Sequence, residues 1–215
     1  MDIQYYGAHC VRIVTKEATI VIDDTLTLLG KKPVVKKGDI ALFSQDAPAA
    51  ISEAQKQAQI TINTPGEYEI AHVAIHGIAA RAHVDEPNTT NSIIFRLISS
   101  DIRLAMLGHI HPEVSEDTLE EIGTIDVLIV PVGGNGYTLD PIGASKLIKK
   151  IAPKIIIPTH YGIKGFNYEV PQQELEEVCK VLAMEPTETT PKLKLKSSAA
   201  LPEATQLIVL EPTTS

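Results

Sequence analysis

The chain has 215 residues, a formal net charge of −8, 44% hydrophobic residues and only 4% aromatic residues. These values suit one domain over residues 1–215, with a core built from Ile, Val, Leu and Ala. The negative charge argues against binding nucleic acid or an anionic membrane, since both reward a basic surface. The sequence has no apolar run long enough to span a membrane and no N-terminal secretion signal, so we expect a soluble cytoplasmic protein.

The first half of the chain is rich in short strand-like segments. Apolar stretches bounded by Gly or by polar turns predict strands at 3–6, 10–14, 19–22, 39–44, 60–63, 68–70 and 73–80. The segment 25–37 reads as a solvated loop, whereas the Ala-rich segment 48–58 has helical spacing. His9 and Cys10 are adjacent residues, and the side chains of adjacent strand residues point to opposite faces, which argues against a thiol–imidazole pair.

The second half of the chain alternates strands and helices. Strands are predicted at 92–98, 102–107, 126–132, 154–158, 192–196 and 206–210, and helices at 115–122, from Asp140-Pro141 onward, and at 171–184. Ser115 and Asp140 are suitable N-caps for the first two helices. Two packed sheets with helices outside would accommodate this order of elements.

Three histidines fall where separated strands end. His83 follows the strand 73–80, His109 follows Gly108, and His160 follows the strand 154–158. Strand ends at one edge of an α/β sheet commonly carry functional groups, so we expect these side chains at a common rim. His111 is two residues beyond His109, and both could reach one ion from an extended segment; ordinary loop histidines are an equally acceptable interpretation.

Several segments together resemble the metallo-β-lactamase-fold hydrolases, in particular their short branch of lactonase-type and Zn-dependent hydrolases. Tyr5–Ile13 and Thr19–Asp23 are similar to that branch's opening strands. Pro65–Ile70, Asp126–Gly134 and Lys154–Tyr161 match its Pro-Gly-Glu-Tyr turn, its Asp-Val-Leu-Ile-Pro-Val-Gly-Gly segment and its Pro-Met-His-Tyr strand end. The resemblance covers nearly the whole chain and implies an αββα sandwich of two mixed sheets, with the site at one edge.

The chain departs from that family at its metal motif, His-x-His-x-Asp-His, which follows a strand ending in Ser. Here Ser44 is present, and the four ligand positions are occupied by Gln45, Ala47, Ala49 and Ala50. His109 stands where the family has a bridging Asp, and His9 lies one position later than the family's opening Gly-His. His83 and His160 match the family's mid-chain and last His. Because Ala cannot bind zinc and Gln binds it poorly, a normal dinuclear site is not expected.

Two hypotheses follow from this resemblance. The leading one is a family relative with a degraded zinc site and no cofactor, inactive or divergent, which binds a small ligand or a protein partner in the edge cleft. The alternative is a hydrolase of a small ester, lactone or phosphoester with a rebuilt site for one zinc, nickel or copper ion. His83, His109 and His160 would then hold the ion, and Asp85 or His111 would move the proton. A homo-oligomer is left open.

Overall fold

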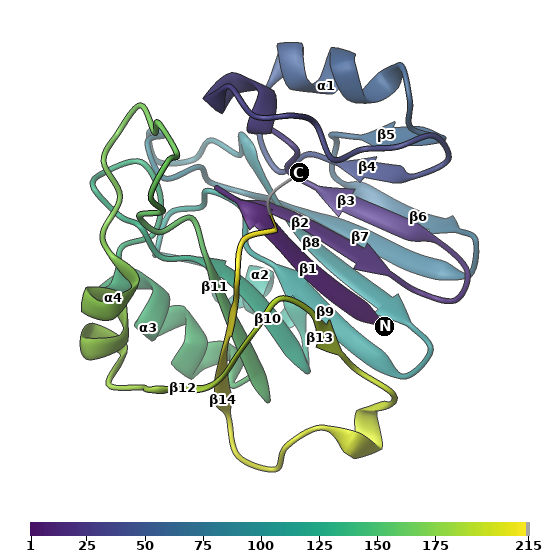
Figure 1. The fold of residues 1–215 in the computed structure, drawn as a ribbon. Coiled ribbons are helices and arrows are strands. Elements are labelled where there is room, and N and C mark those ends of the chain that lie inside the picture. The colour runs from purple at the N-terminus through teal and green to yellow at the C-terminus, as the bar shows by residue number, and fades with distance from the viewer. Residues whose placement is uncertain (214–215) are drawn as a thin grey trace.

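The computed structural model describes residues 1–213, which form two mixed β-sheets packed face to face (Figure 1). The six-stranded sheet has the order β13-β1-β2-β3-β4-β5, and the eight-stranded sheet has the order β12-β14-β11-β10-β9-β8-β7-β6. Within residues 1–213, four α-helices accompany these sheets. The predicted αββα sandwich is therefore confirmed.

The strands agree well with the apolar segments of the sequence. The first sheet contains β1 Asp2–Gly7, β2 Cys10–Val14, β3 Thr19–Ile22, β4 Ile40–Leu42, β5 Ile60–Ile62 and β13 Leu193–Lys194. The second contains β6 Gly66–Ile70, β7 Val73–Ala80, β8 Ser92–Ser99, β9 Ile102–Met106, β10 Val127–Pro131, β11 Ile155–Thr159, β12 Pro186–Thr190 and β14 Gln206–Leu210. All five residues of β10 and all five of β11 are buried, as expected for parallel strands covered on both faces.

The helices are α1 Pro48–Gln55, α2 Glu116–Ile122, α3 Pro141–Ile151 and α4 Leu175–Leu182, with short 3₁₀ turns η1 Leu26–Leu29 and η2 Ser198–Ala200. Both predicted caps are present: the Ser115 hydroxyl accepts the Thr118 amide, and the Asp140 carboxylate accepts the Gly143 amide. Helix α1 covers the outer face of the first sheet, where its alanines pack beside Val21 and Phe43. None of the helices in residues 1–213 has the length and hydropathy needed to cross a membrane.

The structure differs from the predicted elements in two places, at α4 and at β12. The helix expected from Pro171 begins only at Leu175, and of the four residues before it Gln172 lines the cavity described below. Ala71 and His72 lie in the tight β6–β7 turn, where both have left-handed backbone with φ values of 49° and 58°. Residues 186–190, left without an element by the sequence, form edge strand β12, which pairs in parallel with β14.

The parallel part of the second sheet brings distant strand ends together. β10 pairs in parallel with β9 on one side and with β11 on the other, with Ile129 opposite Met106 and Pro131 opposite Thr159. The carboxyl ends of β9 and β11 therefore point to the same edge of the sheet. The segments that leave those ends carry His109 and His160.

Candidate active site

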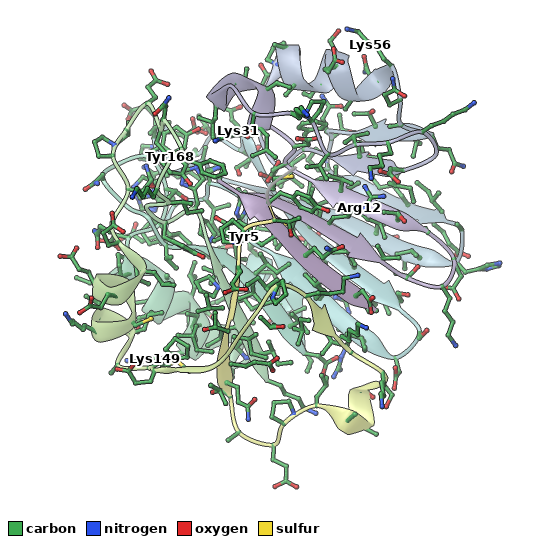
Figure 2. The ribbon with its side chains drawn as sticks, viewed as in Figure 1. Tyr5, Arg12, Lys31, Lys56, Lys149 and Tyr168 are labelled. Carbon is green, nitrogen blue, oxygen red and sulfur yellow. The ribbon has the colours of Figure 1, made fainter. Side chains whose placement is uncertain are left out.

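A cavity of about 200 Å³ lies at this edge of the sandwich. It is lined by Ala8, Thr25, Leu28, Leu29, Gln45, His109, Tyr137, His160, Asn167, Tyr168, Glu169, Val170 and Gln172. His109 and His160 are each only 5% exposed and form its floor, whereas Leu28 is 59% exposed and lies at the mouth. Figure 2 labels Tyr168 in the loop that follows β11, which supplies one wall. The cavity thus has a buried polar floor and a partly apolar opening.

His109 and His160 are in direct contact. Their ring centroids are 4.7 Å apart and the rings are nearly perpendicular, at 85°. The Tyr137 ring packs against both, 5.0 Å from the His109 centroid and stacked 5.5 Å from the His160 centroid. Tyr137 follows the glycine-rich turn after β10, so the three side chains come from the ends of three neighbouring strands.

The orientation of His160 is fixed by a neighbouring amide. Gln172 Nε2 donates to the Val170 carbonyl, so Gln172 Oε1 faces the imidazole and accepts from His160 Nδ1, 3.1 Å away. With its proton on Nδ1, neutral His160 keeps a lone pair on Nε2. The His160 backbone has φ of 53°, an uncommon conformation for a residue other than Gly, and its N–H donates to the Ala8 carbonyl at 2.6 Å.

His109 differs from His160 because its ring makes no side-chain hydrogen bond. Its Nδ1 atom is fully buried and makes no hydrogen bond within the described chain. A buried polar atom without a partner is costly, by about 1–3 kcal/mol, and such atoms in native proteins commonly await a ligand, a water molecule or an ion. His109 Nδ1 therefore keeps an unused hydrogen-bonding atom beside the cavity.

Burial makes both imidazoles weak bases. Desolvation lowers the pKa of His160 to about 4, although the hydrogen bond to Gln172 opposes the shift. Desolvation also lowers the pKa of His109 well below its ordinary value, and the neighbouring His160 adds to the effect. Both rings are neutral at neutral pH, which is the form that binds metal ions and accepts hydrogen bonds.

The other predicted site residues lie beside the cavity rather than in its lining. His83 donates its backbone N–H to the His109 carbonyl at 2.7 Å, but its ring lies near His111, with centroids 6.1 Å apart. His111 Nδ1 accepts the Glu113 amide at 3.1 Å, and the Asp85 carboxylate accepts the Ala82 amide at 3.2 Å. The structure thus brings together the rings of His109 and His160, and separately those of His83 and His111.

The side chains at this edge differ from the ligands of the metal centre that the resemblance implies. Across residues 1–213, no group of three or more His, Cys, Asp or Glu side chains is placed so that it could hold a metal ion. Gln45 lines the cavity, and Ala47 and Ala50 are buried around the start of α1 without any donor atom. A dinuclear centre does not fit. The three-imidazole set stays a prediction; of its members, His109 and His160 have rings in contact.

Sequence reasoning missed three residues that shape the cavity: Gln45, Tyr137 and Gln172. Gln45 was noted only as a lost ligand, but its amide lies 3.4 Å from the Tyr137 hydroxyl in the cavity wall. Tyr137 was part of the matched turn, which was the available signal. Gln172 could not be found, because its segment reads as the first turn of a helix.

Comparison of the sequence with known proteins identifies the family. A model of the Beta-lactamase superfamily domain matches residues 2–160. The chain belongs to this superfamily. Among curated members of the UPF0173 family, a Pyrococcus abyssi protein is 25% identical over 186 residues, which cover 77% of this chain and 85% of the relative. A Carboxydothermus hydrogenoformans protein named as a metal-dependent hydrolase is 46% identical over 44 residues, which cover 20% of this chain and 19% of the relative.

Solved structures of superfamily members share the fold. A proposed Zn-dependent hydrolase of the metallo-β-lactamase superfamily from Thermotoga maritima superposes with a TM-score of 0.75 and 24% identity, covering 97% of each chain. A metallo hydrolase from Ignicoccus hospitalis gives a TM-score of 0.61 and 16% identity, covering 91% of this chain and 99% of that one. At these identities the likeness establishes the metallo-β-lactamase fold alone.

Proposed function

We propose that this protein is a metal-dependent hydrolase of a small ester, lactone or phosphoester, with a single-ion site rebuilt around His109 and His160. Two observations support the proposal. The UPF0173 relative from Carboxydothermus hydrogenoformans is named as a metal-dependent hydrolase. The observation that carries most weight is the buried, unpartnered Nδ1 atom of His109 in contact with a second neutral imidazole. Of our two sequence hypotheses, the hydrolase thus has better support than the inactive relative.

The chain's own residues would prepare the floor of the cavity for hydrolysis. His109 and His160 would hold the ion, and a bound ion of this kind supplies Lewis acidity and lowers the pKa of a water molecule. Gln172 keeps the proton of His160 on Nδ1 and so leaves Nε2 free as a ligand atom. The Tyr137 hydroxyl, beside the Gln45 amide, is suited to donate a hydrogen bond to a substrate oxygen.

The lining favours an uncharged substrate within the proposed class. No Lys or Arg is among the lining residues, and Glu169 adds one negative charge. A phosphoester would thus have no basic side chain in the cavity to contact, whereas an ester or lactone needs none. Leu28 and Leu29 from η1, together with Val170, form an apolar surface at the mouth for an acyl chain. The volume of about 200 Å³ restricts the bound part to a small molecule.

A second candidate is a protein that binds a small ligand in the same cavity without turnover. This candidate is favoured by the side chains themselves, since the described residues 1–213 supply no group of three metal ligands, whereas catalytic zinc sites commonly use three. In that case the neutral rings of His109 and His160 would serve as hydrogen-bonding partners for the ligand.

Hydrolysis assays with matched variants separate the two candidates. Untagged protein, loaded with Zn²⁺ or treated with a chelator, would be tested on phenyl acetate, γ-butyrolactone and phenyl phosphate. We expect zinc-dependent hydrolysis of phenyl acetate or the lactone that His109→Ala abolishes. The control is His72→Asn, which removes a histidine from an exposed turn whose left-handed backbone Asn tolerates. Binding of these compounds without hydrolysis in either metal state would favour the second candidate and contradict the first.

A further inference from the structure

His9 lies behind the cavity floor and is not part of its lining. It is 1% exposed and belongs to the short turn between β1 and β2, in the six-stranded sheet. Both of its ring nitrogens are used. Nε2 lies 2.8 Å from the Leu107 carbonyl oxygen, and Nδ1 lies 2.7 Å from the Thr159 hydroxyl.

These two contacts define the proton positions on the ring. A carbonyl oxygen can only accept, so Nε2 carries the hydrogen and donates it to Leu107. In the neutral ring Nδ1 then holds a lone pair and accepts from the Thr159 hydroxyl. Desolvation lowers the pKa of His9 to about 3, which agrees with a neutral ring. His9 has no free lone pair for a metal ion or a substrate.

The two partners of His9 precede the two floor histidines. Leu107 directly follows β9 and lies two residues before His109, and Thr159 is the last residue of β11 and immediately precedes His160. These strands are not neighbours, because β10 lies between them in the sheet. Strands two places apart are separated by about 10 Å, so no backbone hydrogen bond joins them directly. The His9 ring joins them from the opposite sheet.

The same turn also holds the backbone of His160. The His160 N–H donates to the Ala8 carbonyl, and the Tyr5 hydroxyl donates to that carbonyl at 2.8 Å. Figure 1 shows this end of β1 and β2 beside the loops that follow β11, and Figure 2 labels Tyr5 on β1. The His9 ring also contacts the His109 ring, with centroids 5.3 Å apart.

We propose that His9 is a positioning residue whose two hydrogen bonds, across β10 to the ends of β9 and β11, set the spacing and orientation of His109 and His160. The inference concerns how the cavity floor is assembled, and it applies whether the site hydrolyses or only binds a ligand. It rests on the proposed function only in taking His109 and His160 as the residues that bind the ion or the ligand.

Imidazole NMR on the metal-free full-length protein tests the proposal without a substrate. In the native protein we expect His9 as the Nε2–H tautomer and a nuclear Overhauser contact between the rings of His109 and His160. His9→Phe keeps the ring volume but removes both hydrogen bonds. Thr159→Val removes one of them with little change in shape. Each should weaken that contact at least twofold and shift both floor-histidine resonances, while His9→Gln, which can still donate and accept, restores them.

A control distinguishes positioning from general stabilisation. Ile75→Val removes one buried methyl group from β7 and should lower the melting temperature without changing the contact between the two rings. If His9→Phe does not fold, Thr159→Val and His9→Gln decide the question. A folded Thr159→Val protein with unchanged His109 and His160 signals would overturn the proposal. Because no substrate is used, a failure here is separate from a failure of hydrolysis.

Discussion

Acidification should destabilise this fold through its buried histidines. His9 and His160 are neutral in the folded protein, with pKa values lowered to about 3 and about 4, whereas an unfolded chain protonates histidine near pH 6.5. A histidine whose pKa is lowered by folding stabilises the native state fully above that unfolded value. The contribution is lost as the pH falls toward the folded-state pKa.

The size of the effect follows from these values. Between about pH 8 and pH 5, linkage gives a loss of about 2 kcal/mol for His9 and about 2 kcal/mol for His160. Asp23 acts in the opposite direction, because burial raises its pKa to about 6 despite hydrogen bonds from the Ser44 amide and hydroxyl. Protonation of Asp23 in the folded state returns about 1 kcal/mol over the same interval. Together these three groups lower the free energy of unfolding by about 2–3 kcal/mol.

Urea unfolding followed by far-UV circular dichroism at the two pH values measures this difference. The comparison with His9→Gln isolates one group, since that variant should lose about 2 kcal/mol less on acidification than the native protein. The variant's lower absolute stability cancels from the comparison. Equal pH differences in the two proteins would refute the argument that His9 is held neutral by burial, as would a rise in native stability from pH 8 to pH 5.

Two further predictions concern the turn after β10 and the start of α3. In Gly133→Ala, the new Cβ would lie 2.0 Å from the His160 carbonyl oxygen. We therefore expect the free energy of unfolding in urea to fall by about 1–3 kcal/mol and the His160 resonances to shift. In the control Gly136→Ala, nothing lies within 4 Å of the new Cβ, so we expect only backbone strain of about 1–2 kcal/mol and unchanged His160 resonances. Asp140→Ala should cost about 1 kcal/mol in the same assay, because it removes the cap on the Gly143 amide at the start of α3, and an unchanged midpoint would show that the cap contributes nothing.

Much of the fold was predictable because it depends on local patterns. The unbroken apolar run before Gly133 predicted β10, and strand 206–210 was predicted with the bounds that the structure gives. The helix expected from Pro171 was too long, because hydrophobic periodicity does not reveal tertiary contacts. The segment before Leu175 is held by tertiary contacts, with the Gln173 amide donating to the Gly133 carbonyl and its carbonyl accepting from Gly162. Edge strand β12 is polar and largely exposed, so it gave no hydrophobic signal.

The site was predictable to the extent that strand ends determine it. His109 and His160 were expected at one edge because parallel strands end together, and the structure confirms that they meet. His83 was expected with them; its strand β7 lies in the antiparallel part of the sheet, its ring centroid is 6.1 Å from that of His111, and its place in a shared site stays a prediction. His9 was read only as the neighbour of Cys10 and as a residue one position later than the family's opening His. Its role depends on two residues about 100 and 150 positions away, a separation that sequence spacing does not reveal.

Zinc titration of untagged, chelator-treated protein by isothermal calorimetry, alongside His109→Ala, tests the central claim most directly. The account predicts about one Zn²⁺ bound per chain, with affinity reduced at least tenfold in His109→Ala and unchanged in His72→Asn. Absence of zinc binding, or binding that is the same in His109→Ala, would contradict a metal site on the cavity floor and leave ligand binding without hydrolysis as the function of the cavity.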